Sequence, residues 1–164
     1  MADVFTKAKR SEVMSRIRSR GNRDTELALA SLFRRHTITG WRKQVQVRIA
    51  ERGVRSSGAL RSARPALRVK PDFVFRKARV TVFVDGCFWH GCPRHATWPA
   101  NRAAWWRRKI KGNQTRDRLV NRTLRRTGWR VIRIWEHELH KRGVRNAERG
   151  TARLVRRIQA ALSG

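Results

Sequence analysis

The segment from Val80 to Pro93 constrains the fold of this chain more than any other. It opens with a nearly continuous apolar run, Val80-Thr81-Val82-Phe83-Val84, and passes directly into a motif of Asp, Cys, His and aromatic residues at 85–93. A short apolar run rich in β-branched residues predicts a central strand that is covered on both faces. We therefore expect chemically active side chains at the end of a buried strand.

A second strand is expected at 70–75, directly before this one. The short basic turn Arg76–Arg79 separates the two segments. Strands joined by so tight a turn should pair as an antiparallel hairpin.

The remaining pattern predicts alternating helices and strands. A helix is expected from an N-cap at Asp24-Thr25 to about His36, and a long helix from Asn101 to about Thr127, ended by Gly128. Further strands are expected at 41–47 and 129–135, and an amphipathic helix at 151–162. This order predicts a single domain over 1–164, an α/β sandwich around a mixed sheet flanked by helices.

Two basic segments do not fit a regular pattern. Residues 9–20, within an amino-terminal region 1–22, are consistent with a short helix or with an arm that clasps DNA. The Arg-rich stretch 48–68 is interpreted as a loop. It either becomes ordered on DNA or is a solvated connection, and the sequence leaves both interpretations open.

The charge balance points to nucleic acid. Lys and Arg total 41 against 11 Asp and Glu, a formal net charge of +30. A domain with this charge repels itself unless a polyanion neutralises it, and DNA phosphates are the natural partner. There is no secretory signal and no apolar stretch of membrane-spanning length, so we expect no membrane partner and a cytoplasmic, nucleoid-associated protein.

Two cysteines and two histidines have spacing typical of a metal site. Cys87, Cys92 and His95 form the pattern C-x4-C-x2-H, and His137 follows the strand at 129–135. Two thiolates and two imidazoles suit tetrahedral Zn²⁺, and four protein ligands make the site structural. The sequence alone leaves alternatives open: His140 or water could replace one histidine, or the thiols could simply be buried.

A pair of acids predicts a second metal. Asp72 follows Pro71 at the start of one strand, and Asp85 ends the next. The pair resembles part of a nuclease core in which carboxylates on adjacent strands bind Mg²⁺. A lysine is usual two residues after the second acid, but Cys87 stands there instead. Asp72 could alternatively be a carboxylate that caps local amides.

Another group must then act on the attacking water. His90 lies between the two cysteines, and an imidazole is suited to general-base catalysis near neutral pH. Glu26 and Asp117 are carboxylates on the apolar lines of their helices, so they need a buried partner or a function. They are the expected orienting groups. The alternative is that His90 is itself a zinc ligand.

Aromatic residues gather around the same motif. Phe88 and Trp89 are adjacent in a short loop, and Trp106 lies in the long helix. Single tryptophans usually fill a core. Two adjacent rings in so short a loop favour insertion between DNA base steps.

The motif Val84-Asp85-Gly86-Cys87-Phe88-Trp89-His90 resembles the hallmark of the very-short-patch repair (Vsr) mismatch endonucleases. The similarity extends to 14–20, 23–25, 71–73, 106–117 and 128–136. It implies a restriction-endonuclease-like fold and a nick on the 5′ side of the T in a T·G mismatch. Such mismatches arise by deamination of 5-methylcytosine, and the nick starts repair.

The resemblance also implies residue roles. Asp72 and the backbone carbonyl of Val84 would hold Mg²⁺, and His90 would be the general base supported by Glu26 and Asp117. The residues expected to contact DNA are Phe88, Trp89 and Trp106 from one groove, Met14 and Ile17 from the other, and Lys109 and Asn113.

This chain departs from the family pattern at several positions. Asp85 stands where some members have His, so a role for that His cannot be transferred, and Asp85 could join the metal. His137 stands where some members have Cys, Cys92 where some have His, and Arg94 where some have Cys, which brings in His95. The stretch 48–68 is longer than usual and could change DNA affinity.

Two other functions are consistent with the residues. One is a restriction or homing-type endonuclease on the same fold, and the other is a non-catalytic zinc-containing DNA-binding protein. We expect a monomer that acts on double-stranded DNA, with mismatch-repair proteins as candidate partners.

Overall fold

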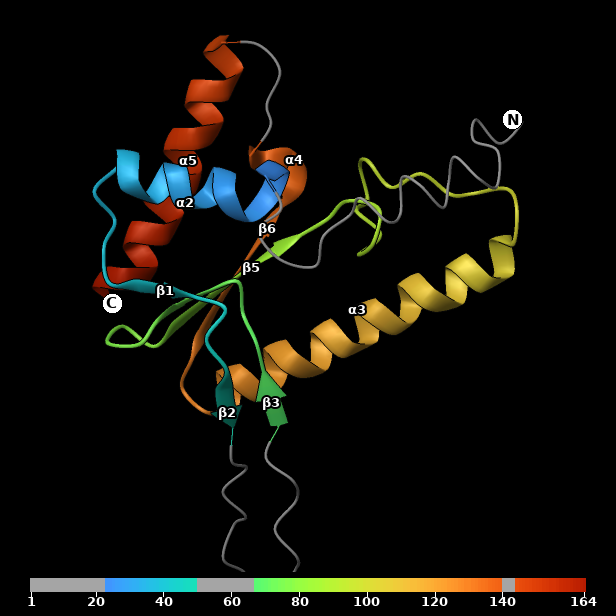
Figure 1. The fold of residues 1–164 in the computed structure, drawn as a ribbon, viewed down its shortest axis with the longest axis horizontal. Helices are drawn as coiled ribbons and strands as arrows, with labels where there is room; N and C mark the ends of the chain where they lie inside the picture. The colour runs from blue at the N-terminus through green and yellow to red at the C-terminus, as the bar shows by residue number, and fades with distance from the viewer. Residues whose placement is uncertain (1–22, 50–66, 140–143) are drawn as a thin grey trace, which may run out of the picture.

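The computed structural model describes residues 23–49, 67–139 and 144–164, without the side chains of 23, 24 and 144–147. The arm 1–22 with Met14 and Ile17, the interior of the 48–68 stretch, and His140 lie outside the described residues. The elements are η1 (Arg23–Leu27), α2 (Ala28–Arg35), β1 (Trp41–Lys43), β2 (Val47–Ile49), β3 (Leu67–Val69), β4 (Phe73–Phe75), β5 (Val80–Asp85), α3 (Ala103–Arg126), β6 (Arg130–Trp135), α4 (Glu136–Leu139) and α5 (Val144–Ser163) (Figure 1).

The main sheet is mixed, as the sequence predicts. Its strand order is β1-β4-β5-β6. The β4–β5 pair is the predicted antiparallel hairpin, with Phe73 opposite Val82, whereas β5 and β6 are parallel, with Val80 opposite Arg130. Parallel neighbours need a crossover, and α3 provides it. The α/β architecture is therefore confirmed and is consistent with a restriction-endonuclease-like core.

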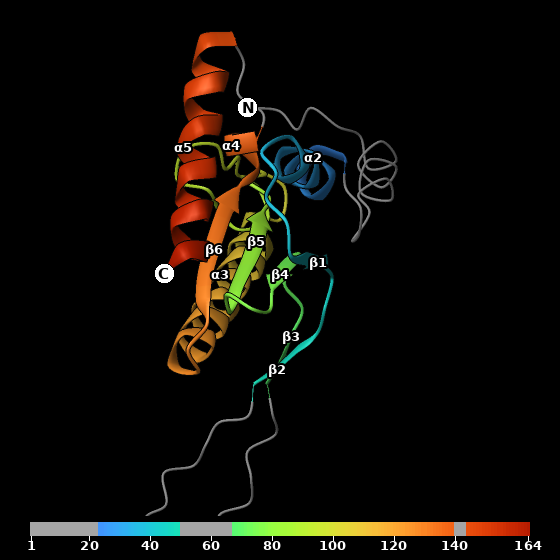
Figure 2. The same ribbon diagram turned by 90° about the vertical axis from the view of Figure 1, so that its left-hand side faces the viewer.

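Helices cover both faces of this sheet (Figure 2). On one face, Phe33 of α2 and Ile158 of α5 pack with Val82 of β5 and Ile134 of β6. On the other face, Leu124 of α3 packs with Val74 of β4, with Phe83 and Val131 against the same cluster. Strand side chains alternate between faces, so burial on both sides makes β5 the central strand that its composition predicts.

The predicted strand 41–47 is wrong in its second half. Gln44 has a positive φ of 55°, and its N–H donates a hydrogen bond to the Asp72 carbonyl oxygen at 3.1 Å. This local conformation ends β1 at Lys43. The chain then enters a separate two-stranded ribbon, β2–β3, in which Val47 lies opposite Val69.

Other boundaries also differ from the prediction. The first helical turn is a wide π turn that begins at Arg23, before the expected N-cap at Asp24-Thr25. The short helix α4 was not expected, and α5 begins at Val144 rather than at 151. Ribbon strands β2 and β3 occupy the two ends of the predicted loop 48–68. No helix among the described residues combines the length and apolar character needed to cross a bilayer.

Candidate active site

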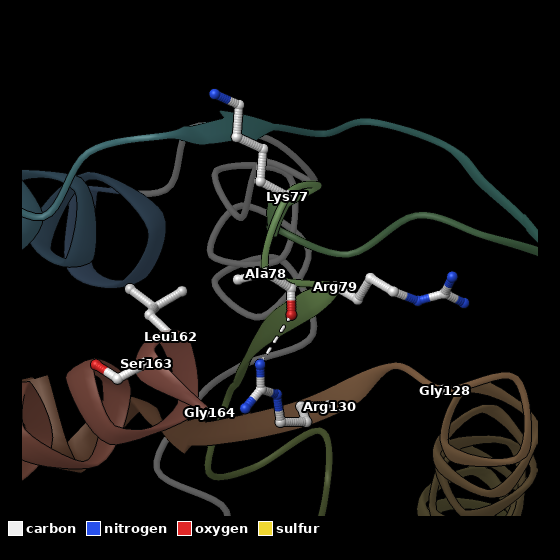
Figure 3. A pocket seen from close by; sticks show the side chains of 8 residues that line it. All are labelled: Lys77, Ala78, Arg79, Gly128, Arg130, Leu162, Ser163 and Gly164. Atoms are coloured by element: carbon white, nitrogen blue, oxygen red, sulfur yellow. Dashed lines mark hydrogen bonds between the residues drawn. The ribbon is translucent and has the colours of Figure 1, made fainter.

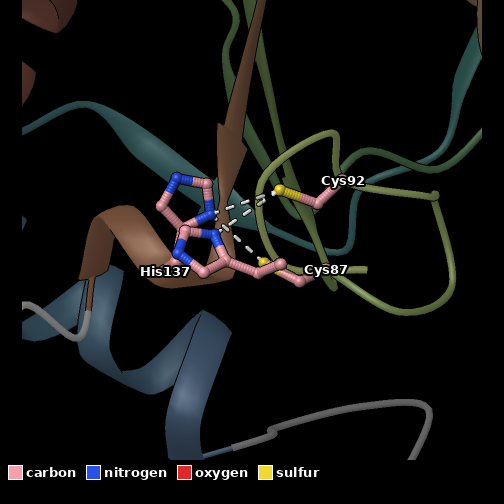
Figure 4. Close-up of side chains that lie close together, drawn as sticks. Cys87, Cys92 and His137 are labelled. Atoms are coloured by element: carbon pink, nitrogen blue, oxygen red, sulfur yellow. Dashed lines mark hydrogen bonds between the residues drawn. The ribbon is translucent and has the colours of Figure 1, made fainter. Parts of the chain in front are cut away.

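The four predicted zinc residues lie together. Sγ of Cys87 is 3.2 Å from Nδ1 of His137, and Sγ of Cys92 is 3.6 Å from the same atom and 3.7 Å from Nδ1 of His95. Side chains of Cys87, Cys92 and His137 point toward one another (Figure 4). A tetrahedral zinc ion separates its S and N ligands by about 3.6 Å, so the four residues fit this metal.

The loop that carries this cluster is held at several points. The Glu136 carboxylate accepts a hydrogen bond from the Cys87 N–H at 3.0 Å. From α3, the Asn113 side chain donates to the Trp89 carbonyl at 2.8 Å, and that of Gln114 donates to the His90 carbonyl at 3.2 Å. These bonds fix the backbone on both sides of the His90 imidazole.

His90 faces two of the predicted acids. Its Nδ1 is 2.6 Å from Oδ2 of Asp117 and 3.7 Å from Oδ1 of Asp85. A carboxylate at Nδ1 favours the tautomer that carries its proton there, which leaves Nε2 as the basic atom. The side chain is 20% exposed, so this nitrogen lies in a partly desolvated site.

Arg133 is a site residue that the sequence analysis missed. Its guanidinium donates to Asp85 at 2.6 and 2.7 Å and contacts Oδ1 of Asp117 at 2.9 Å. These contacts and the His90 hydrogen bond outweigh the effect of burial and lower the pKa of Asp117. A signal was present in the sequence. Arg133 alternates with Ile132 and Ile134 on β6, which places it on the face toward α3.

Asp72 lies in an acidic cluster. Its Oδ2 accepts a hydrogen bond from the Val84 N–H at 2.7 Å. Burial raises the pKa of Asp72 to about 6, although this bond opposes the shift, and the nearby charges of Glu26 and Asp85 raise it further. Glu26 is 6% exposed and accepts a hydrogen bond from Gln44 Nε2 at 3.0 Å. A buried carboxyl whose pKa is raised by burial and by neighbouring carboxylates fits a hard divalent cation such as Mg²⁺.

These contacts bring the predicted acids and the histidine to one end of β5. Asp72 accepts a hydrogen bond from the N–H of Val84, the residue before Asp85, and Asp85 lies 3.7 Å from His90. His90 and Asp72 are therefore linked through Asp85. Asp85, His90 and Asp117 also form a group whose ligand atoms lie within 4.8 Å of one another.

The predicted aromatic wedge is a packed cluster. Phe88 and Trp89 meet edge to face with ring centroids 5.2 Å apart, and Trp106 packs on both at 5.0 and 5.9 Å. Trp105, which is 49% exposed, extends the cluster against Trp106 at 4.7 Å. Trp98, which is 55% exposed, lies in the segment that joins β5 to α3. Neither Trp98 nor Trp105 was predicted to be a site residue.

Two further predicted DNA contacts, Lys109 and Asn113, both lie on α3 but have different surroundings. Lys109 is exposed on α3, where it is accessible to a phosphate. The Asn113 amide donates to Trp89 and so supports the loop.

A hollow of about 590 Å³ lies at the opposite end of the sheet (Figure 3). Lys77, Arg79 and Arg130 line it, together with residues 162–164 of α5 and its end. Arg130 donates a hydrogen bond to the Ala78 carbonyl at 3.1 Å. None of the predicted site residues lines this hollow.

Comparison with known proteins identifies the family. The family model of the DNA mismatch endonuclease Vsr matches residues 43–95. The DNA mismatch endonuclease Vsr of Escherichia coli is 37% identical over 160 residues, which cover 94% of this chain and 86% of that protein. The type II nicking enzyme V.XorIIP of Xanthomonas oryzae pv. oryzae is 34% identical over 149 residues, covering 90% of this chain and 93% of that protein.

A third relative matches more strongly over a shorter segment. The type II nicking enzyme V.NaeI of Lentzea aerocolonigenes is 51% identical over 72 residues, which span 44% of this chain and 43% of that protein. The resemblance expected from the Cys-Phe-Trp-His motif is thus confirmed. The two long alignments cover nearly all of this sequence, so the chain belongs to the Vsr family of DNA mismatch endonucleases.

Proposed function

We propose that this endonuclease hydrolyses one phosphodiester bond on the 5′ side of the T in a T·G mismatch, in a magnesium-dependent reaction. The observation that carries the proposal is the His90–Asp117 pair at 2.6 Å, set beside the acidic cluster around Asp72. Mismatches of this kind arise when 5-methylcytosine is deaminated. The nick would begin their repair.

Asp72 and the Val84 carbonyl are the proposed Mg²⁺ ligands. Bound there, the ion would stabilise charge on the scissile phosphate and lower the pKa of a water molecule. Glu26, buried beside Asp72, would add negative charge that favours cation binding. The Val84 N–H donated to Asp72 holds that carboxylate in place.

His90 is the proposed general base. With Nδ1 bonded to Asp117, Nε2 accepts a proton from water as the water oxygen forms a new bond to phosphorus. The bond from phosphorus to the leaving sugar oxygen breaks, and that oxygen takes up a proton from solvent water. The negative charge of Asp117 stabilises the imidazolium that forms.

The zinc cluster would be structural. Cys87, Cys92, His95 and His137 would occupy all four positions of the ion and fix both ends of the loop that carries His90. Burial raises the pKa of the Cys87 thiol, so a bound cation would be needed to keep the thiolate form near neutral pH. Metal analysis of the wild type and of Cys92→Ser tests this assignment: one zinc per chain is expected, and is lost in the variant.

The aromatic cluster would open the mismatch. Phe88, Trp89 and Trp106 form an apolar group beside the catalytic residues, and insertion of rings into a base step would unstack it. A mismatched step has less stacking and pairing energy to lose than a paired one. Discrimination for the mismatch follows from this difference.

The decisive experiment measures nicking of a T·G duplex and of its fully paired counterpart, with Mg²⁺ present. Asp72→Ala and His90→Ala should each lower the nicking rate by at least about 10²-fold and leave duplex affinity within a few-fold of wild type. Glu148→Ala, which removes an exposed carboxylate from α5, is the control. Double-strand cleavage of paired DNA, or no cleavage by the wild type, would contradict the proposal.

A further inference from the structure

Arg133 occupies the centre of a charge network beside the catalytic histidine. Its Nε donates to Oδ2 of Asp85 at 2.6 Å and its Nη2 to Oδ1 at 2.7 Å, which is a bidentate pair. Nη2 also contacts Oδ1 of Asp117 at 2.9 Å. Nη1 donates to Asn121 Oδ1 at 3.1 Å, and the guanidinium lies over the Phe83 ring at 4.9 Å.

This geometry changes the interpretation of Asp85. Both of its carboxylate oxygens are engaged by one guanidinium, and its side chain is only 7% exposed. Coordination of Mg²⁺ by the same oxygens would place a cation beside the guanidinium and weaken that pair, in a site where a poorly paired buried arginine is costly. Asp72, by contrast, accepts the Val84 N–H at Oδ2 and forms no bidentate pair with a guanidinium of the described residues.

The same geometry fixes Asp117. One of its oxygens contacts Arg133 and the other contacts His90. A carboxylate held at both oxygens cannot rotate, so the direction in which the imidazole Nε2 points is set by the position of the guanidinium. The planar, five-donor fork of arginine suits this bridge, and a lysine ammonium cannot reproduce it.

We propose that Arg133 is a positioning residue for the nicking reaction. It holds Asp117, and through it His90, while Asp85 serves to hold Arg133 and is not a ligand of the metal. The proposal rests on the proposed function, because it assigns a role in that reaction.

Stabilisation of the fold alone does not explain the placement of Arg133. Buried ion pairs contribute little net stability, and apolar residues of similar volume often replace them without loss. Arg133→Met removes only one partner and leaves the Asp85 carboxylate buried without its guanidinium, so this variant is expected to be less stable than wild type. The double variant Asp85→Asn/Arg133→Met removes both charges and is expected to fold with stability nearer to that of wild type. Of the four polar contacts that Arg133→Met removes, three converge on the two acids beside His90, and the fourth is to Asn121.

The test compares Arg133→Met, Arg133→Lys, Asp85→Asn and the double variant Asp85→Asn/Arg133→Met as full-length, metal-replete proteins. Single-turnover nicking at saturating protein should fall by about 10- to 100-fold in Arg133→Met, because misplacement of a catalytic group has effects of this size. Arg133→Lys should recover part of the loss. Duplex affinity and the Mg²⁺ concentration at half-maximal rate should change less than about threefold, as expected for a residue that acts on the chemical step.

The double variant separates the two roles of Asp85. If Asp85 acts through Arg133, the double variant nicks no more slowly than Arg133→Met alone. Asp85→Asn should also leave the Mg²⁺ midpoint unchanged. Further loss in the double variant, or a raised midpoint in Asp85→Asn, would assign Asp85 to the metal and overturn the proposal.

Arg130→Met is the matched control on the same strand. Arg130 donates to the Ala78 carbonyl at the other end of β6, so its loss removes the same charge without touching the network. Wild-type nicking by this variant is expected. An equal loss in both arginine variants would show a general effect of charge and would contradict the proposal.

One readout does not depend on nicking. The His90 Nδ1 proton that bridges to Asp117 at 2.6 Å should give a downfield ¹H–¹⁵N signal, lost or shifted in Arg133→Met and retained in Arg130→Met. An unchanged signal in Arg133→Met would overturn the positioning role. A wild type that shows the signal but does not nick T·G DNA would refute the proposed function instead.

Discussion

At the scale of single residues, the catalytic loop depends on a glycine. Gly91 has a φ of +63°, and a Cβ there would lie 2.7 Å from Gln114 Nε2 and 2.9 Å from Ile110 Cγ2. Both neighbours belong to α3, and Gln114 also holds the His90 carbonyl. An added methyl group must therefore displace the Gln114 amide, and with it the hydrogen bond to His90, and also press on the buried Ile110 side chain.

We predict that Gly91→Ala lowers the free energy of unfolding by about 1–3 kcal/mol, from backbone strain and overpacking together. Nicking should fall as well, because His90 is the preceding residue. Gly112→Ala is the control: a Cβ at this position would meet nothing within 4 Å, and alanine in a helix should raise stability by about 0.5–1 kcal/mol. Urea unfolding of both variants checks the prediction, which fails if the two shift in the same direction.

Asp72 should make stability depend on pH. Its pKa is about 6 in the folded protein against 3.8 for the ordinary carboxyl, with burial as the main cause. The folded state then binds the proton more tightly than the unfolded state, so the free energy of unfolding decreases as pH rises from about 4 to about 6. Without Mg²⁺, Asp72→Asn should equal wild type near pH 3.5 and exceed it by up to about 3 kcal/mol at pH 7.

Urea midpoints of the two proteins across this pH range measure the difference. Carboxyls that do not interact with Asp72 titrate alike in both proteins and cancel in the comparison. Mg²⁺ at pH 7 should raise the midpoint of wild type and not that of Asp72→Asn. A pH-independent difference would mean that Asp72 is ionised without cost.

At the scale of secondary structure, the sequence predicts those elements whose position depends on hydrophobic periodicity. The apolar run at 80–84 identified the central strand, and the turn 76–79 identified the hairpin. The break after Lys43 was missed because it depends on a positive φ at Gln44 and on its hydrogen bond to the Asp72 carbonyl, which are tertiary in origin. Likewise, Arg133 gains its role only when α3 brings Asp117 beside it, and strand periodicity alone could have marked it as inward-facing.

In the β2–β3 ribbon, strand pairing places two positive charges next to each other. Arg48 and Arg68 lie directly opposite each other, and both are exposed. Like charges at a cross-strand pair are destabilising, and a phosphate between them would remove the repulsion.

Arg68→Glu should therefore stabilise the free protein by about 0.2–1 kcal/mol and weaken its affinity for duplex DNA. Arg68→Gln should reduce the slope of log affinity against log salt by about 1. Arg42, exposed on β1 opposite Val74, is the control, since Arg42→Gln relieves no cross-strand repulsion. Unfolding and salt-titrated binding measure the two effects, and unchanged affinity in Arg68→Glu would exclude the ribbon from the DNA interface.

At the scale of the whole molecule, the charge of +30 sets two opposite responses to salt. In the free protein, salt screens the repulsion among basic residues, so the free energy of unfolding should rise with NaCl concentration. In the complex, each phosphate contact releases counterions, so salt should weaken binding. For 6–10 contacts the loss is about 10³- to 10⁵-fold between 50 and 200 mM.

The opposite signs make this prediction specific. A general effect of solutes on hydrophobic burial would also stabilise the free protein, but a nonionic osmolyte at matched osmolality would then reproduce it. We expect the osmolyte to leave the affinity for DNA within a few-fold, whereas NaCl lowers it steeply. Urea unfolding and duplex binding in the same buffers measure both quantities. Parallel responses to NaCl and to the osmolyte would show that the basic surface is not what couples this protein to DNA.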